Sequence, residues 1–409
     1  MAGTAATALA VHGGRLIAVG SDDHIAQHAG PLTIAHDLRG QAVMPGLIES
    51  HAHALWGACR DLFDVYVGYE ATLEQLLEAA AARAAKLAPG AFILGGPWRP
   101  DMLAQAVKYF IESFNWMGIT GFKEPMAFEE DLAAYKAADA AGLLTLHMAA
   151  HIVRFSPYGT APVPYPQMER LAKTYRSTNI RTGFAKLFLD RVAPSFTASF
   201  IAPYLASAGY DAGAHDPATT LLLDAKTMAD TMTELDRRGF VVKTHAVGDF
   251  AVRTTLDAIA AARARDGNSG LRHEVSHCAF VDPADQPRFT QLGAVAEMSP
   301  KLWFPNPATA GQIRVLGAAR TQTCHAFRSM LESGAEVTYS SDWPAAAPDA
   351  NPWTGLTGML SRQNHSGSFP GVLGADQALT LDQALPLFTL AGAQSGRMEA
   401  QTATLKVGK

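Results

Sequence analysis

The stretch AVMPGLIESHAH, residues 42–53, opens the part of the chain whose pattern decides the fold. It is an apolar run that ends in polar residues, and similar runs follow at residues 118–125, 142–149, 183–190, 239–247, 272–280, 293–300 and 335–343. Ala- and Leu-rich stretches with helical spacing separate these runs, for example residues 128–142, 224–239 and 250–267. Eight strands that alternate with helices predict an α/β fold, a TIM-like (βα)8 barrel whose chemistry lies at the carboxyl ends of the strands.

The first 40 residues follow a different pattern. Short apolar runs such as LAVHGG, RLIAVGS and LTIAHDL alternate with Gly and Asp turns, which is typical of β-hairpins. These strands are too few to build a core of their own. We therefore expect the barrel to begin at about residue 41.

The composition excludes several classes of protein. The chain has 409 residues with 33 Lys and Arg against 38 Asp and Glu, and it has no basic cluster of the kind that nucleic-acid binding requires. The three cysteines, Cys59, Cys278 and Cys324, are widely separated, so we expect no disulfide framework and no CxxC metal site. Neither a signal peptide nor a long apolar run is present, which predicts a soluble cytoplasmic protein with no membrane partner.

Two histidines close the first predicted strand. His51 and His53 are two positions apart, so on a strand both side chains point to the same side and can converge on one ion. Such a short motif also arises by chance, and two ordinary loop histidines are the alternative interpretation.

Four further polar residues lie at the ends of other predicted strands: Lys186, His245, His277 and Asp342. In a closed barrel these ends surround one mouth, and the last strand neighbours the first, so Asp342 is expected beside the histidine pair. His245 and His277 come from adjacent strands on the opposite side. Imidazoles and carboxylates that face each other across a cavity suit zinc or another borderline divalent ion.

Lys186 is unusual in such a site, because an ammonium group repels a cation. In an apolar strand, however, desolvation favours the neutral amine, which can add carbon dioxide and become a carbamate, a carboxylate equivalent. The alternative is a lysine paired with Asp190 or another acid. Lys123 is a rival carbamate site, and we expect it to pair with Glu124 or with an acidic group of the substrate.

The remaining histidines have weaker claims. His151, just beyond the third predicted strand, is a candidate substrate-binding residue, with a polar loop residue as the alternative. His273 could replace His277 as a ligand. We expect the others at the surface: His12, His24, His28, His36, His215, His325 and His365. The chain has no G-x-S-x-G motif, P-loop or strand-following G-x-G-x-x-G, which argues against serine-hydrolase and nucleotide-binding functions.

The ordered motifs VMPGLIESHAH, AKLFLD, THAVGD, SHCAFVDPAD and SSDWP resemble the amidohydrolase superfamily, specifically its amidohydrolase-3 or YtcJ-like branch. Weaker matches at GGRLIAVG and ILGGPW extend the resemblance over residues 8–409. It implies a metal-dependent hydrolase with a TIM-like barrel and a small β-sandwich built from both chain ends. We thus expect part of the sandwich in residues 1–40, the barrel in 41–395, and a truncated return to the sandwich in 396–409.

The resemblance also assigns roles. It implies two divalent metal ions, with zinc preferred: His51 and His53 would bind the more buried one, and His245 and His277 the other. Lys186 would be the carbamylated bridge, and Asp342 both a ligand and the proton shuttle.

The chain departs from the branch in four places. The segment after ILGGPWRP is much shorter than usual, and the chain ends at TATLKVGK before the closing strands of the sandwich. Arg191 and Ser276 stand where a Gly and a Glu are common. We therefore expect a sound barrel beside an incomplete β-sandwich.

The expected reaction is hydrolysis of a non-peptide C–N bond of a small amide-type substrate, by a metal-activated hydroxide with Asp342 as proton shuttle. Two alternatives remain: an esterase or lactonase that uses the same site, and a non-catalytic, metal-binding regulatory relative. A homodimer is left open.

Overall fold

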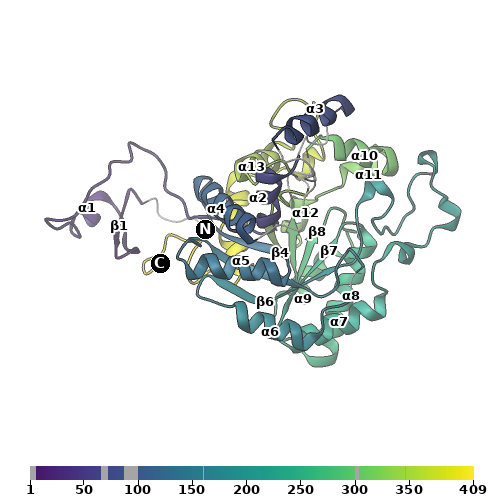
Figure 1. Ribbon diagram of the computed structural model, residues 1–409, viewed down its shortest axis with the longest axis horizontal. Helices are drawn as coiled ribbons and strands as arrows, with labels where there is room; N and C mark the ends of the chain where they lie inside the picture. Colours follow the sequence, from purple (N-terminus) through teal and green to yellow (C-terminus); the bar gives the residue numbers. More distant parts are fainter. Residues whose placement is uncertain (1–5, 66–71, 87–99, 160, 300–303, 346) are drawn as a thin grey trace.

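The computed structural model describes residues 6–65, 72–86, 100–159, 161–299, 304–345 and 347–409. Its centre is a sheet of eight parallel strands that neighbour each other in chain order (Figure 1). These are β3 (Leu47–Glu49), β4 (Ile119–Ala127), β5 (His147–Val153), β6 (Ile180–Phe188), β7 (Val241–Ala246), β8 (Glu274–His277), β9 (Val295–Met298) and β10 (Glu336–Tyr339). Each predicted run overlaps one strand, although β4, β5 and β6 extend beyond the bounds of their runs, and the predicted TIM-like α/β fold is confirmed.

The first and last strands meet just beyond their carboxyl ends. The backbone N–H of Ser50 donates to the carbonyl of Tyr339 (3.2 Å), and that of Asp342 to the carbonyl of His51 (2.9 Å). A third bond runs from the N–H of His53 to the carbonyl of Trp343 (2.8 Å). These bonds form the seam of the barrel, and they place Asp342 beside the histidine pair as predicted.

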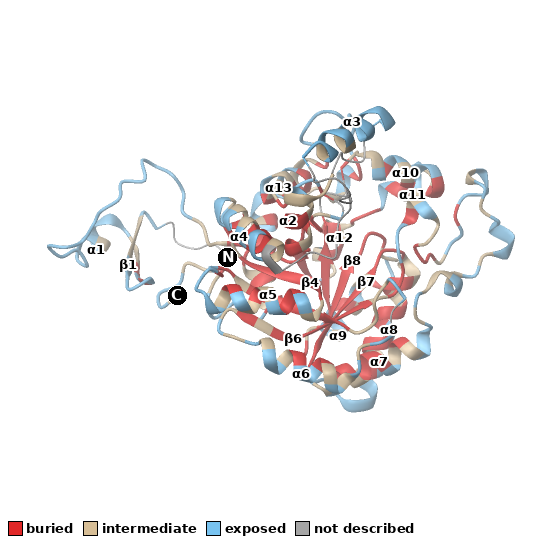
Figure 2. Ribbon diagram, viewed as in Figure 1, coloured by how far each residue is buried: buried red, intermediate tan, exposed pale blue. Residues whose placement is uncertain are grey.

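Helices cover the outside of the sheet, and most of them bury one face, whereas α3 is largely exposed (Figure 2). In α7, for example, Asp224 caps the first turn by accepting from the N–H of Thr227 (2.9 Å). Met228 and Met232 point inward from this helix and are fully buried, each worth about 1.5–3 kcal/mol of hydrophobic burial. The helices are α2 (Ala54–Phe63), α3 (Leu73–Ala84), α4 (Pro100–Trp116), α5 (Glu129–Ala140), α6 (Tyr165–Tyr175), α7 (Ala225–Arg237), α8 (Asp249–Asp266), α9 (Gln286–Leu292), α10 (Pro307–Leu316), α11 (Ala318–Gln322), α12 (Phe327–Glu332), α13 (Pro352–Ser361), α14 (Leu381–Ala384) and α15 (Leu390–Ser395). None of those described combines the length and the apolar character that a bilayer crossing demands.

An aromatic cluster fixes α4 and α5 against the start of the barrel. The rings of Phe110 and Phe122 lie 5.5 Å apart, and those of Phe110 and Tyr135 5.8 Å apart, both edge to face. Pairs of this kind add about 0.5–1.5 kcal/mol beyond the area they bury. The strand that follows the histidine pair therefore has a rigid outer support.

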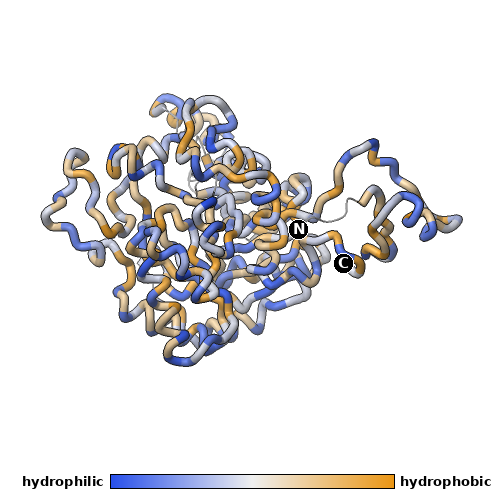
Figure 3. Tube along the Cα trace, turned by 180° about the vertical axis from the view of Figure 1, so that it is seen from behind, coloured by the Kyte–Doolittle hydropathy of each residue, from blue (hydrophilic) through white to orange (hydrophobic). Residues whose placement is uncertain are grey.

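The N-terminal segment forms an arm that projects from the barrel (Figures 1 and 3). Strands β1 (Ala8–His12) and β2 (Arg15–Gly20) pair in an antiparallel hairpin, followed by the short helix α1 (Asp22–Ala26). The C-terminal residues lie against β2, where Leu16 exchanges backbone hydrogen bonds with Lys409 (2.6 Å) and Gly408 (2.8 Å). The arm is thus a small antiparallel sheet at which both ends of the chain meet.

Candidate metal centre

The structure brings the six predicted ligands together at the carboxyl end of the barrel. They come from five separate segments of the chain and line one cavity of about 1130 Å³: His51, His53, Lys186, His245, His277 and Asp342. Only His245 is more than slightly exposed.

Three of these side chains form a tight cluster. Nε2 of His51 lies 3.5 Å and Nε2 of His53 3.6 Å from the same carboxylate oxygen, Oδ1 of Asp342. Zinc ligands lie 2.0–2.1 Å from the ion, so tetrahedral neighbours are about 3.3 Å apart, close to both separations. No residue in the described part of the chain donates a hydrogen bond to the carboxylate of Asp342, which is only 7% exposed. The donor set therefore fits a divalent ion.

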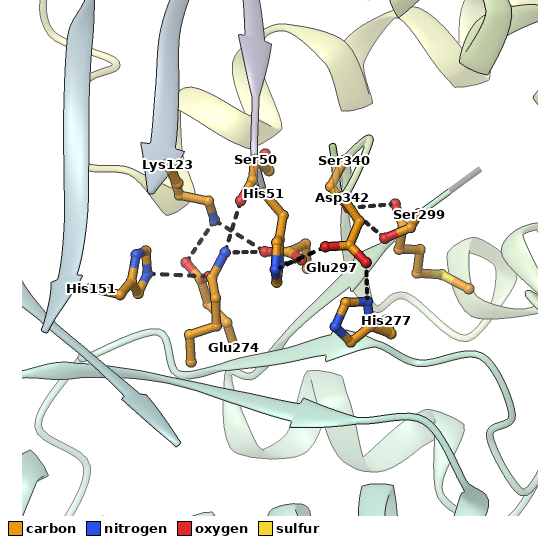
Figure 4. Close-up of polar contacts among 12 residues, drawn as sticks. Ser50, His51, Lys123, His151, Glu274, His277, Glu297, Ser299, Ser340 and Asp342 are labelled. Atoms are coloured by element: carbon orange, nitrogen blue, oxygen red, sulfur yellow. Dashed lines mark hydrogen bonds and ion pairs between the residues drawn. The ribbon is translucent and has the colours of Figure 1, made fainter. Parts of the chain in front are cut away.

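The backbone is strained at two of the candidate ligands. His277 has φ 74° and Asp342 has φ 54°, both in the left-handed region that non-glycine residues seldom adopt. Such conformations cost of order 1–3 kcal/mol and persist where the surrounding structure enforces them. Here they direct Nδ1 of His277 toward Oδ2 of Asp342, 3.9 Å away (Figure 4).

His245 extends the cluster away from His51. Its ring centre lies 4.4 Å from that of His277, and its Nε2–H donates to the carbonyl oxygen of Arg191 (3.2 Å). That bond leaves Nδ1 with a free electron pair. Burial and the nearby Lys186 lower the pKa of His245 to about 3, so the ring is neutral and able to bind a metal at physiological pH.

Lys186 is buried without an acidic partner among the described residues. It is 1% exposed, and among the described residues it forms neither an ion pair nor a hydrogen bond; its ammonium nitrogen lies 4.9 Å from the ring centre of Phe188. Burial and the charge of Lys243 lower the pKa of Lys186 to about 7. The alternative partner, Asp190, instead accepts the backbone N–H groups of residues 199, 247 and 248, so that pairing is absent.

Burial also changes the ionisation of Asp342. Burial raises the pKa of its carboxyl group to about 6, although His53 and Lys186 act in the opposite direction. An acid whose pKa lies near the working pH can both accept and return a proton.

A buried network of charges adjoins the cluster (Figure 4). Lys123 binds Oε1 of Glu274 (2.8 Å) and the hydroxyl of Ser395 (2.7 Å). Glu124 instead accepts a hydrogen bond from the hydroxyl of Tyr135 (2.8 Å), so the expected pairing of Lys123 with Glu124 is wrong, whereas its pairing with an acidic group of the substrate stays a prediction. The strand register separates Lys123 from its chain neighbour, because adjacent side chains point to opposite faces.

The second half of the network reaches the ligands. Nδ1 of His51 lies 2.5 Å from Oε1 of Glu297, and Lys243 binds the other oxygen of Glu297. Neither Lys243 nor Glu297 was a candidate from the sequence. The sequence did contain a signal: each is a charged residue inside an otherwise apolar predicted strand, Lys243 in VVKTHAV and Glu297 in GAVAEMSP.

Three other histidines are placed as follows. His151 is fully buried, donates from Nδ1 to the carbonyl of Glu124 (3.1 Å), and is absent from the described cavity lining, so its contact with substrate stays a prediction. His273 binds Asp236 (2.8 Å), away from the cluster. The surface position expected for His325 is wrong: it is fully buried and lines the cavity. His325 follows α11 rather than a strand, so its position in the alternation of strands and helices did not indicate that it reaches the cavity.

Aromatic rings form one wall of the cavity. Trp56 stacks on His53 with ring centres 5.9 Å apart, and Tyr158 stacks on Trp56 at 6.4 Å. Further apolar side chains line the same space: Met126, Phe188, Val192, Phe304 and Pro307. The cavity thus combines a polar base with largely apolar walls, as small-molecule sites do.

Comparison with known proteins places the chain in a family and identifies proteins that are similar to it. The model of the amidohydrolase family matches residues 35–106 and 99–409. The chain is 22% identical over 509 residues to the N-substituted formamide deformylase of Arthrobacter pascens, covering 99% of this chain and 88% of that protein. It is 24% identical over 229 residues to the putative amidohydrolase YtcJ of Bacillus subtilis (strain 168), covering 55% and 39% of the two chains. An uncharacterized metal-dependent hydrolase from Pyrococcus horikoshii OT3 has the same fold, with TM-score 0.74, 17% identity, and coverage of 98% and 91%.

Proposed function

The chain belongs to the amidohydrolase family, and on this premise we propose that it hydrolyses a non-peptide C–N bond of a small amide with the help of bound divalent ions. The observation that carries the proposal is the convergence of His51 and His53 on one oxygen of Asp342 at the base of the cavity.

The donor set favours two zinc ions. His51, His53 and Asp342 would hold one ion, and His245 and His277 the second, with a carbamate on Lys186 as the bridging carboxylate. The lowered pKa of Lys186, near 7, supports this, because only the neutral amine adds carbon dioxide. Divalent ions bound there would lower the pKa of a water ligand and polarise the carbonyl oxygen of a substrate.

Asp342 would move the proton. Its carboxylate takes a proton from the attacking water as the oxygen forms a bond to the acyl carbon, and it then gives that proton to the leaving nitrogen. The C–N bond breaks, and the products are a carboxylic acid and an amine. Without bound metal, burial raises the pKa of Asp342 to about 6, closer to neutral pH than that of a free carboxyl group.

The walls of the cavity favour a substrate with an apolar nitrogen substituent. The polar base has room for a small acyl group, and the ring of Trp56 offers a flat surface for an aryl or alkyl arm. The relative from Arthrobacter pascens is named for N-substituted formamides, and we propose the same class of substrate for this chain: N-formyl and N-acyl amines.

A substrate panel tests the proposal. The zinc-loaded protein is expected to release acid from N-formyl and N-acyl amines with an aromatic arm, and a chelator should abolish the reaction. Turnover confined to esters or lactones would replace the amidase by an esterase. Bound zinc without turnover of amides, esters or lactones would point to a regulatory binder instead.

A further inference from the structure

One carboxylate in the buried network touches a candidate ligand directly. Glu297 is completely buried on β9, and its Oε1 lies 2.5 Å from Nδ1 of His51. Its second oxygen is held by the ammonium group of Lys243, which also donates to the carbonyl of Ser50 (2.7 Å). The ring of His51 and the carbonyl of Ser50, which directly precedes it, therefore both contact the Lys243–Glu297 pair.

The contact determines which nitrogen of His51 carries its proton. A carboxylate beside a lysine accepts hydrogen bonds, so the short contact requires a proton on Nδ1. A neutral imidazole with its proton on Nδ1 has a free electron pair on Nε2, the atom that faces Asp342 at 3.5 Å.

We propose that Glu297, held in place by Lys243, is a positioning residue that fixes the ring of His51 in the tautomer and orientation required to bind a metal ion. The inference rests on the metal site of the proposed function, and it does not depend on which substrate that site hydrolyses. Replacing a hydrogen-bond partner of a metal-binding histidine commonly lowers metal affinity 10- to 100-fold.

The contact between Glu297 and His51 is not needed to balance the charges of the network. Lys123 and Lys243 face Glu274 and Glu297, two positive groups against two negative ones. Glu274 is as deeply buried as Glu297 and also contacts Lys243 (3.1 Å), yet it touches no candidate ligand. Glu274 is therefore a matched control for the loss of a buried carboxylate.

Glu297→Gln tests the proposal by changing one acceptor into a donor. The amide has one oxygen and one NH2 group, and both of its neighbours are donors. The charged Lys243 should take the oxygen, because charge-assisted hydrogen bonds are the stronger ones. The NH2 group then faces Nδ1 of His51 and favours the tautomer with its proton on Nε2, which blocks metal binding.

A second substitution should reverse this effect. In the double variant Glu297→Gln with Lys243→Met, the competing ammonium group is gone, and the amide oxygen can turn to His51. One positive and one negative group are removed together, so no unpaired charge is created by the exchange itself.

The measurement is the zinc affinity of the metal-free proteins, determined by competition with a chelator, with circular dichroism to show that each variant is folded. We expect affinity to fall 10- to 100-fold in Glu297→Gln, to recover to within about threefold in the double variant, and to change less than threefold in Glu274→Gln. Wild-type affinity in Glu297→Gln, or no recovery in the double variant, would overturn the proposal.

A direct measurement covers the case in which Glu297→Gln does not fold. Nitrogen-15 NMR of histidine-labelled, metal-free wild type should show the proton of His51 on Nδ1, and a proton on Nε2 would overturn the inference. A wild-type protein that binds no zinc would refute the metal site itself. Zinc binding that responds to Glu297→Gln without any hydrolysis would refute only the proposed function.

Discussion

Lys186 on β6 and Lys243 on β7 are register partners on neighbouring strands, yet only Lys243 has carboxylate partners among the described residues. Both side chains are buried. Burial acts to lower the pKa of Lys243, but Glu274 and Glu297 outweigh it and raise that pKa above its usual value. Burial lowers the pKa of Lys186 to about 7. One lysine is therefore a fixed charge, and the other can supply a neutral amine to the cavity.

Lys186→Ala is expected to lose the bridging ligand. The protein should retain fewer zinc ions than wild type, and kcat should fall at least 100-fold, because second ions and their bridge contribute several kcal/mol to such reactions. Acetate or propionate should restore part of the activity by placing a carboxylate in the vacated space. Metal content and kcat with and without these acids check this. Unchanged metal content together with unchanged turnover would exclude the bridge.

Asp342→Asn should lower kcat about 10²- to 10⁴-fold, since the amide cannot take up the proton. The fold should survive, because Asn tolerates the left-handed backbone at this position and the bond from the backbone N–H to His51 is unaffected. Kinetics, zinc content and the melting temperature should be measured on one preparation. Near-normal turnover with zinc retained would rule out the proton shuttle.

The stability of the buried network should depend on acid through Glu274. Burial acts to raise the pKa of this carboxyl, but Lys123 and Lys243 outweigh it and lower the pKa from 4.5 to about 2. The stabilisation is therefore complete above the unfolded pKa and is lost as pH falls toward 2. Between pH 6 and pH 3 the group should account for about 2 kcal/mol of the loss in the free energy of unfolding.

Glu274→Gln provides the comparison. It should be about 3–5 kcal/mol less stable than wild type at pH 6, because two buried ammonium groups lose a partner. It should also lack the acid-dependent loss assigned to Glu274. Urea unfolding of both proteins at the two pH values measures this difference, and parallel losses in the two proteins would contradict the assignment.

Gly57 lies where α2 passes the indole ring of Trp343. A Cβ atom at this position would overlap the ring, which is 3% exposed and directly follows Asp342. Gly57→Ala should therefore destabilise the protein by about 1–3 kcal/mol, although alanine favours helices, and should lower activity by displacing Asp342.

Gly30→Ala is the control for that substitution. Nothing lies within 4 Å of a Cβ atom there. Its melting temperature and activity should match those of wild type. A Gly57→Ala protein as stable and as active as this control would contradict the packing argument.

Trp56→Ala should change substrate preference. KM is expected to rise about tenfold for N-formyl amines with an aromatic arm, since stacking on the indole is lost, and to stay unchanged for N-methylformamide. Equal effects on both substrates would show that the arm does not lie against Trp56.

The barrel and the order of its ligands were predictable from the sequence because both follow from local patterns. Each run from residue 42 onward overlaps a strand, and parallel strands in a closed barrel necessarily bring His51, His245 and Asp342 to one rim. The pairing of Lys123 with Glu274 was not predictable, because it joins residues on opposite sides of the barrel interior.

Two other features depended on packing that no local pattern records. His325 reaches the cavity from an irregular segment beyond α11, where burial depends on the helices around it. Glu297 gains its role only because closure of the barrel leaves β10 alone between β9 and the first strand, which brings Glu297 within reach of His51. Long-range side-chain contacts of this kind require the three-dimensional arrangement itself.

The seam of the barrel has a consequence for biosynthesis. His51 and His53 leave the ribosome early, whereas Asp342 and the strand that precedes it emerge only after nearly the whole barrel has been made. The nascent chain therefore carries an exposed pair of imidazoles without the carboxylate that completes their cluster. The hydrogen bond from Asp342 to the carbonyl of His51 is one of the three that close the ring of strands, and it also holds Asp342 beside the two histidines, so a chain halted before β10 has neither the seam nor the cluster.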